Sequence, residues 1–199
     1  MRIYSFKIYI EKMKKYDEFK NIPGLFLYQN IFPESVNNEI IEWLDKQEWS
    51  NTLSRRTQQY GYTYDYKSRN INPTKPLTSY ILKIAKWLKE IGLMRNPNQC
   101  IVNEYKKNQG ISPHIDNTNF GPVIISISLN DDTNFIMSKD NKTHTIYVPK
   151  LSMLVLCGDA RYKWKHSIPN RKKVSTNNRN ITKDDNYRRI SLTYRTVAN

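Results

Sequence analysis

The sequence predicts a mainly β protein with flanking helices, built as a double-stranded β-helix (a jelly-roll or cupin-like barrel) with an N-terminal helical and lid region. Two amphipathic helical segments lie in the first half of the 199-residue chain. After Pro97, about eight short alternating or β-branched segments follow one another, separated by turn residues. Helices followed by a run of strands indicate a double-sheet architecture with the helices packed outside.

The N-terminal region begins with a charged stretch, residues 1–22, which we expect to be a leader of uncertain order before a single domain over 23–199. Residues 23–32 predict a strand that ends at Pro33. Residues 35–47 predict a helix with Ser35 as its N-cap, because apolar side chains recur on one face.

A second helix is predicted over residues 77–91, where Ile81, Ile84 and Leu88 fall on one stripe and Gly92 follows as a C′ residue. The polar segment 169–186 predicts a flexible loop. The predicted strands span 99–106, 111–116, 122–129, 133–138, 143–149, 151–157, 161–168 and 187–197.

The charge and the apolar pattern limit the partners and the compartment. The net charge of +14 comes from 32 Lys and Arg against 18 Asp and Glu, which favours a polyanion such as nucleic acid. A Lys-, Asn- and Ile-rich composition also arises from an AT-rich genome without any selection for binding. The longest apolar run, 151–157, is too short to span a bilayer. With two cysteines and no clear signal peptide, we expect a monomer in the cytoplasm or nucleus without membrane contact.

Polar pairs on predicted strands suggest a metal site. His114 and Asp116 are two residues apart, so on a strand both project to the same side. A chance pair in a surface loop would look the same, and a facial triad needs a third ligand. His166 follows a strongly apolar strand and is the preferred third ligand, whereas His144 is expected at an exposed hairpin turn.

Two further strands carry polar residues at alternate positions. On 188–195, Arg189, Ser191, Thr193 and Arg195 share one face, and on 100–107 Asn103 and Tyr105 do so. A solvated outer face would look the same. If these faces point inward, two buried arginines require anions, and a small dicarboxylate would satisfy both.

The ordered set Asn103-x-Tyr105, His114-x-Asp116, His166 and Arg189-x5-Arg195 resembles the AlkB family of Fe(II)/2-oxoglutarate dioxygenases. The stretches QQYGYTYDY, PHIDN, SISL, GDARYKWKHSI and RRISLTYR look most like the branch that hydroxylates modified wobble uridines in tRNA. Members of that branch can also carry an RNA-recognition module and a methyltransferase domain, for which this chain has no room.

The resemblance implies a role for each of these residues. His114, Asp116 and His166 would bind Fe(II), and 2-oxoglutarate and O2 would occupy its open positions. Arg189, helped by Tyr105, would pair with the distal carboxylate of 2-oxoglutarate. Arg195 and Asn103 would support its metal-chelating end.

The resemblance implies that the segment 54–69 covers the substrate as a nucleotide-recognition lid. Its candidate substrate-binding residues are Arg55, Arg56, Tyr60, Tyr62 and Tyr64, and Tyr66 continues the alternation. Tyrosines on one strand face could stack on a splayed base while the arginines contact phosphates. A tyrosine-rich hairpin packed on the core is the other interpretation.

Three functions remain open on the sequence. The first is an iron dioxygenase that oxidises a modified base, by tRNA uridine hydroxylation or by oxidative dealkylation of RNA or single-stranded DNA. A separate methyltransferase subunit would then be a possible partner. The second is the same chemistry on a methylated protein side chain. The third is a nucleic-acid-binding module with a vestigial iron site, against which the intact ligand and arginine set speaks.

Overall fold

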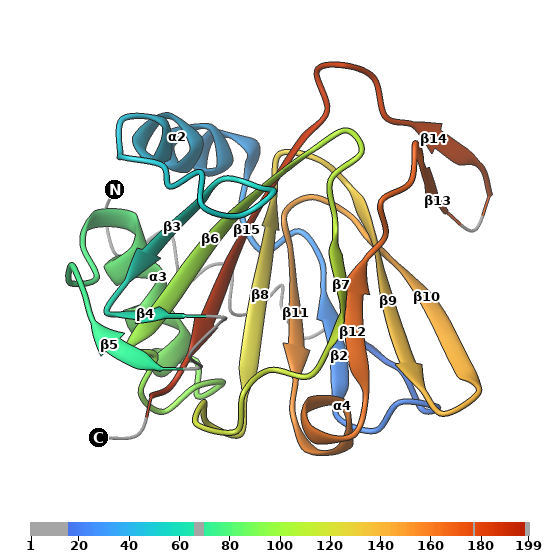
Figure 1. Ribbon diagram of the computed structural model, residues 1–199, viewed down its shortest axis with the longest axis horizontal. Helices are drawn as coiled ribbons and strands as arrows, with labels where there is room; N and C mark the ends of the chain where they lie inside the picture. The colour runs from blue at the N-terminus through green and yellow to red at the C-terminus, as the bar shows by residue number, and fades with distance from the viewer. Residues whose placement is uncertain (1–15, 66–69, 177, 198–199) are drawn as a thin grey trace.

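Two antiparallel β-sheets face each other in the computed structural model, which describes residues 16–65, 70–176 and 178–197 (Figure 1). The larger sheet has seven strands, in the order β1 (Tyr16–Glu18), β2 (Leu25–Tyr28), β11 (Ser152–Leu156), β8 (Ile124–Leu129), β15 (Arg188–Arg195), β6 (Gln99–Lys106) and β3 (Thr57–Tyr60). The smaller sheet has four, in the order β10 (Lys142–Val148), β9 (Thr133–Lys139), β12 (Lys165–Ile168) and β7 (Ile111–His114). This architecture confirms the predicted double-stranded β-helix.

Two hairpins and three helices complete the described part of the chain. The hairpins are β4 (Tyr62–Tyr64) with β5 (Ile71–Pro73), and β13 (Lys173–Ser175) with β14 (Asn180–Thr182). The helices are α2 (Glu34–Asp45), α3 (Ser79–Glu90) and the short α4 (Gly158–Tyr162). In this part of the chain, no helix has both the length and the apolar character needed to cross a bilayer.

Both faces of the seven-stranded sheet carry buried apolar side chains, and each face packs against a different partner. On one face, Ile125 and Leu192 pack with Ile40 of α2 and Leu88 of α3. On the other face, side chains such as Ile124 pack toward the four-stranded sheet. Because successive strand residues point to opposite faces, the larger sheet is the middle layer between helices and the smaller sheet.

Both long helices form where apolar periodicity predicts them, with one correction at an end. Helix α2 begins at Glu34 with Pro33 at the N-cap, so the prediction of Ser35 as the cap is wrong. The amides of Val36 and Asn37 donate to the Pro33 carbonyl, and Glu34 lies in the first turn, where a negative charge is favourable. Gly92 has the positive φ of a C′ residue (+74°), as predicted for α3.

Several predicted segments differ from the structure. Residues 158–162 form α4, so only the second half of the predicted strand 161–168 is extended. The predicted loop 169–186 contains the β13–β14 hairpin, which Asn134 of β9 anchors through two hydrogen bonds to the Ser175 backbone. The predicted leader of residues 1–22 ends in β1, which pairs with β2; residues 1–15 of that leader lie outside the described residues.

Candidate active site

His114 and His166 lie opposite each other on adjacent strands of the smaller sheet. They are register partners in the antiparallel pairing of β7 and β12, and their ring centroids are 4.3 Å apart. Phe135 of β9 stacks on the His166 ring at 5.4 Å. The Ser112 carbonyl lies 2.8 Å from His114 Nδ1, and because a carbonyl only accepts, Nδ1 is the donor; in the neutral imidazole the lone pair is then on Nε2.

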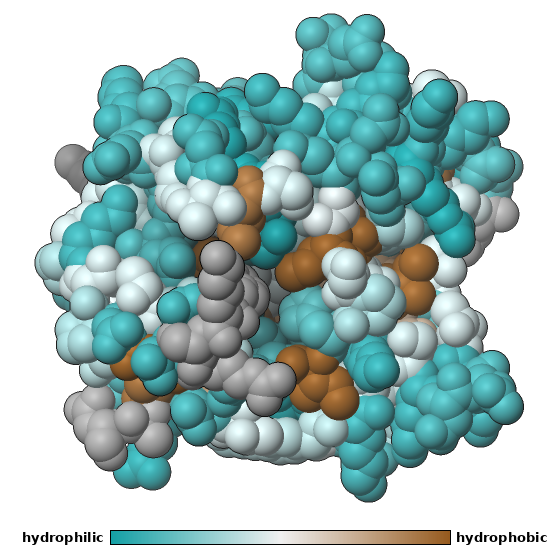
Figure 2. Space-filling view, in the orientation of Figure 1, coloured by the Kyte–Doolittle hydropathy of each residue, from teal (hydrophilic) through white to brown (hydrophobic). Residues whose placement is uncertain are grey.

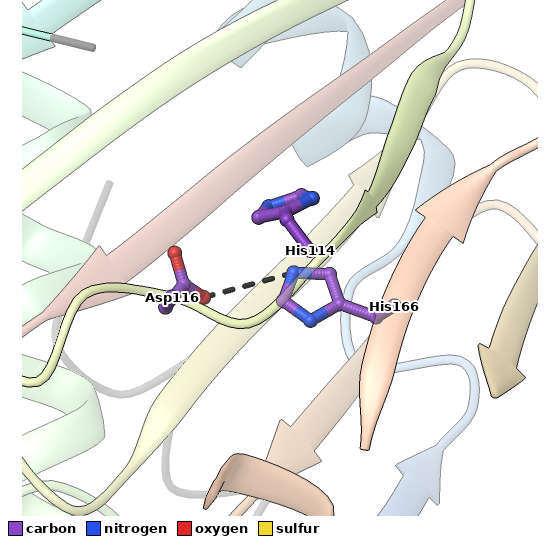
Figure 3. Close-up of side chains that lie close together, drawn as sticks. All are labelled: His114, Asp116 and His166. Atoms are coloured by element: carbon purple, nitrogen blue, oxygen red, sulfur yellow. Dashed lines mark ion pairs between the residues drawn. The ribbon is translucent and has the colours of Figure 1, made fainter. Parts of the chain in front are cut away.

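Asp116 completes the cluster from a loop and not from the strand. Strand β7 ends at His114, so the expectation that His114 and Asp116 share a strand face is wrong. The chain turns after His114 and still directs Asp116 toward both histidines (Figure 3). One ligand atom from each residue lies within 4.8 Å of the other two.

The protonation states of these side chains suit a metal site. Burial raises the pKa of Asp116, but Arg195, the two histidines and Arg161 outweigh it and lower the pKa to about 2. Burial also lowers the pKa of His166 to about 4. At neutral pH the cluster therefore contains a carboxylate and a neutral His166 imidazole, the forms that bind a metal ion.

Arg195 donates a hydrogen bond to one carboxylate oxygen of Asp116, and the other oxygen is available to a metal ion. Arg195 Nη2 donates to Asp116 Oδ1 at 2.6 Å. Asp116 Oδ2 is buried and accepts no hydrogen bond from any residue that the structure describes; His166 Nε2 lies 3.7 Å from it. A buried carboxylate oxygen beside two imidazoles, without a donor of its own, fits a divalent cation, and two His with one carboxylate is the ligand set of non-haem Fe(II) oxygenases.

Arg161 of α4 holds the loop that carries Asp116. The residue is 2% exposed, and its guanidinium donates to four loop carbonyls. Nη1 binds the carbonyl of Asp116 at 2.9 Å and Nη2 that of Asn117 at 2.7 Å. The carbonyls of Phe120 and Gly121 accept at 3.2 and 3.3 Å. Backbone carbonyls carry no sequence signal, so this role of Arg161 could not be found from the sequence.

Arg161→Lys is expected to lower metal affinity by about 10- to 100-fold, the range for partners that orient metal ligands. A lysine ammonium is a compact charge and cannot reach four carbonyls as the guanidinium fork does. Mn(II) binding by calorimetry, with the melting temperature recorded in parallel, measures the effect. Arg188→Lys, which disturbs the ion pairs of Arg188 with Asp45 and Glu104 away from the metal cluster, is the control. If Arg161→Lys lowers the melting temperature but binds Mn(II) normally, Arg161 only stabilises the fold.

A cavity beside the cluster is lined by the polar faces of β6 and β15. Arg189, Ser191, Thr193 and Arg195 all line it, as do Asn103 and Tyr105. The alternate residues Ile190, Leu192 and Tyr194 pack on the helix side. Both polar faces therefore point into the cavity, and the alternative of a solvated outer face does not hold.

Arg189 is a buried cation without a carboxylate partner among the described residues. It is 2% exposed, and its Nε donates to Ser128 Oγ at 2.9 Å. Its guanidinium carbon lies 5.3 Å from the Tyr105 ring centroid. Burial lowers the pKa of Arg189, which shows that the site disfavours an uncompensated charge. An anion in the cavity would compensate it.

The predicted tyrosine face is interrupted, and only one of its described members, Tyr64, lines the site. Gly61 has φ +77° and ends β3, so Tyr60 and Tyr62 do not continue one alternation. Tyr60 is 1% exposed and packs on the helix side, which contradicts its assignment to a substrate surface. Tyr62 packs against the apolar residues that lie between the two sheets. Tyr64 lines the mouth of the site, which is the open hollow in front of His114 and Asp116. Tyr66 lies outside the described residues.

The two arginines of the predicted lid point in opposite directions. Arg55 is buried and lines the cavity beside the metal cluster. Arg56 makes two hydrogen bonds to the buried carboxylate of Glu104, which also accepts from Arg188, so Arg56 belongs to this ion-pair cluster and not to a substrate surface. His144 lies within β10, 5.6 Å from the Trp164 ring, and not at a turn; it is absent from the metal cluster, as predicted.

Comparisons with known proteins agree with this geometry. Residues 26–195 match the model of the 2OG-Fe(II) oxygenase superfamily. An alkylated DNA repair protein ALKBH8 homolog of Arabidopsis thaliana is 32% identical over 92% of this chain and 61% of its own length. An uncharacterised protein of Acanthamoeba polyphaga mimivirus is 29% identical over 94% of this chain and 91% of its own.

A further relative and a solved structure also match most of this chain. The tRNA (carboxymethyluridine(34)-5-O)-methyltransferase ALKBH8 of Macaca fascicularis is 31% identical over 75% of this chain, which covers only 25% of that protein. The solved structure of OsALKBH1 superposes with a TM-score of 0.68 at 18% identity, over 91% of this chain and 99% of that one. The family match and the cluster of His114, Asp116 and His166 together show that the chain belongs to the 2OG-Fe(II) oxygenase superfamily, as an AlkB-like dioxygenase that uses Fe(II), 2-oxoglutarate and O2.

Proposed function

We propose that this dioxygenase oxidises a modified base in nucleic acid, with a modified uridine of tRNA as the favoured target and an alkylated base as the second. His114, Asp116 and His166 hold Fe(II), and the cavity of β6 and β15 holds 2-oxoglutarate. When bound, the iron supplies the chemistry that couples oxidative decarboxylation of 2-oxoglutarate by O2 to oxidation of a C–H bond.

The chain itself contributes position, charge and exclusion of water. Arg195 donates to one oxygen of Asp116 and so fixes the orientation of the other toward the metal position. Arg189 and Tyr105 bind a carboxylate of the cosubstrate at the buried end of the cavity. The apolar side chains of Ile124, Phe135 and Leu156 complete the lining and keep the site dry.

The observation that carries the proposal is the mouth, a hollow of about 450 Å³ that opens at His114 and Asp116. This volume is in the range of small-ligand pockets, so a base extruded from its strand would fit. Tyr64 and Phe120 flank the mouth with ring centroids 5.6 Å apart, and Asn117 Nδ2 donates to Tyr64 Oη at 3.3 Å. Figure 2 shows apolar side chains near the centre of this otherwise mainly hydrophilic face.

A shallow groove continues from the mouth across β7 toward a basic hairpin. Ser54 and residues 110–113 line both the mouth and this groove, and the groove ends at Pro169 and Asn170. The next residues, Arg171, Lys172 and Lys173, are exposed and lead into the β13–β14 hairpin. A nucleic-acid strand whose target base enters the mouth would therefore have basic side chains beside its flanking phosphates.

The relatives named as tRNA methyltransferases also bear on partners. The chain spans 61% of the Arabidopsis relative and about a quarter of the macaque one. We propose that any methyl transfer linked to this substrate is carried out by sequence beyond these 199 residues or by a separate methyltransferase subunit. Copurification of a methyltransferase with the chain tests this partner.

The function is tested by aerobic turnover with Fe(II) and 2-oxoglutarate against modified oligonucleotides, with base analysis by mass spectrometry. The panel contains tRNA anticodon stem-loops with modified wobble uridines, methylated RNA and single-stranded DNA, and a methyl-lysine peptide. Product on a nucleic acid, with succinate formed in equal amount, supports the proposal. Product on the peptide alone contradicts it.

Replacing Arg171, Lys172 and Lys173 together by Gln is expected to weaken oligonucleotide binding and to flatten its salt dependence. Each lost phosphate contact reduces the magnitude of the negative slope of log K against log salt by about 0.7 for a single strand. Three lost contacts therefore reduce it by about 2. The matched control neutralises Lys83, Lys86 and Lys89, three exposed lysines of α3 on the helix side. An unchanged salt slope in the hairpin variant would show that the strand does not follow the groove.

A further inference from the structure

Arg55 connects two parts of the site that the sequence assigns to different ligands. It lines both the cavity beside the metal cluster and the mouth in front of it. Its Nε donates to Asn103 Oδ1 at 2.8 Å, and the residue is 6% exposed. Thr57, two residues on, is the register partner of Asn103, so the pairing of β3 with β6 holds this contact in place.

Arg55 and Arg189 are the two cations of the cavity that lack a carboxylate among the described residues. Arg195 is paired with Asp116. The guanidinium carbons of Arg55 and Arg189 lie 5.6 and 5.3 Å from the centroid of the same Tyr105 ring. The ring offers both a weak cation–π attraction, but two buried cations near one aromatic ring are stable together only with an anion nearby.

We propose that Arg55 is a cosubstrate-binding residue that donates to a carboxylate of 2-oxoglutarate, and that it couples cosubstrate binding to nucleic-acid binding. The second part rests on the function proposed above. Arg55 forms part of the mouth together with Leu53, Ser54 and Tyr64. An anion in the cavity holds the Arg55 side chain inward, and this fixes the wall against which the substrate binds. Coupling of this kind is reciprocal, so each ligand raises the affinity for the other by the same factor.

The geometry gives a matched control in the adjacent residue. Arg56 makes two hydrogen bonds to Glu104 on the outer face and lines neither the cavity nor the mouth. Arg55→Lys and Arg56→Lys therefore make the same chemical change at neighbouring positions that face opposite ways. Arg55→Gln removes the charge but keeps an amide that can still donate to Asn103.

The first measurement is 2-oxoglutarate affinity of the Mn(II)-loaded protein, without nucleic acid. Arg55→Gln is expected to raise the dissociation constant roughly 10- to 100-fold, the loss of one charged hydrogen bond. Arg55→Lys is expected to have a smaller effect and Arg56→Lys none. Melting temperatures measured without ligands separate a loss of 2-oxoglutarate affinity from a loss of folding stability. Unchanged affinity in Arg55→Gln overturns the assignment, whatever the substrate proves to be.

The second measurement is the dissociation constant of a substrate oligonucleotide, anaerobically, with and without saturating 2-oxoglutarate. In the native chain we expect the cosubstrate to tighten oligonucleotide binding about fivefold or more, the lower end of usual coupling between sites. In Arg55→Gln, the ratio of the oligonucleotide dissociation constant without cosubstrate to that with saturating cosubstrate should fall to about one. An equal ratio in both proteins overturns the coupling. If the native chain binds no oligonucleotide, the proposed function fails, and the first measurement still decides the role of Arg55.

Discussion

His114→Ala is expected to abolish substrate oxidation and to weaken Fe(II) binding by at least about 100-fold. Changing the partners that merely orient metal ligands already costs about 10- to 100-fold, and this change removes one of three ligands. His114 is only half-buried, and its ring makes one hydrogen bond, to the Ser112 carbonyl, so the substitution leaves no buried charge without a partner. Anaerobic metal titration and 2-oxoglutarate turnover measure the two effects.

Two other variants complete this experiment. Asp116→Ala removes the partner of Arg195, whose side chain is 8% exposed, and an uncompensated buried charge costs about 3–5 kcal/mol of stability. A loss of activity in Asp116→Ala could therefore come from weaker metal binding or from unfolding. His114→Ala separates these two causes and is the sharper test. His144→Ala is the control and should keep native metal affinity, because His144 lies on β10 outside the cluster. Native metal affinity in His114→Ala would refute the ligand assignment.

Arg189→Met is expected to raise the dissociation constant of 2-oxoglutarate by a factor between roughly 30 and a few thousand. Removing one partner of a buried, hydrogen-bonded charge pair costs about 2–5 kcal/mol, and every 1.4 kcal/mol is about tenfold in affinity. Without cosubstrate, the same variant should be as stable as the native chain or more stable. Burial lowers the pKa of Arg189, so the free protein bears a cost for holding this charge, and methionine removes it.

Thermal unfolding with and without 2-oxoglutarate, in the presence of Mn(II), measures both effects. A ligand at 100 times its dissociation constant stabilises the native protein by about 2.7 kcal/mol, and this gain should nearly vanish in Arg189→Met. Arg188→Met, the neighbouring residue on the opposite face of β15, serves as the control because Arg188 pairs with Asp45 and Glu104 away from the cavity. A full ligand-induced shift in Arg189→Met would mean that the cosubstrate lies elsewhere.

The sequence by itself determined the parts of the site that lie inside regular strands. On β15, Arg195 stands six positions after Arg189, and on β6 Tyr105 stands two positions after Asn103, so both spacings are even. Because side chains alternate strictly along a strand, each pair must share a face, and on β15 the apolar residues at the alternate positions identify the packed side. The helical stripes of α2 and α3 follow in the same way from local periodicity.

Only the tertiary structure decided what depends on strand ends, turns and distant partners. Asp116 reaches the metal cluster from a loop, which Arg161 holds through backbone carbonyls more than forty residues away in the sequence. Gly61, with its positive φ, ends the alternation that would have placed Tyr60 beside Tyr64. Arg55 turns inward because β3 pairs with β6 opposite Asn103. Strand pairing and packing determine these positions, and local periodicity contains no information about either.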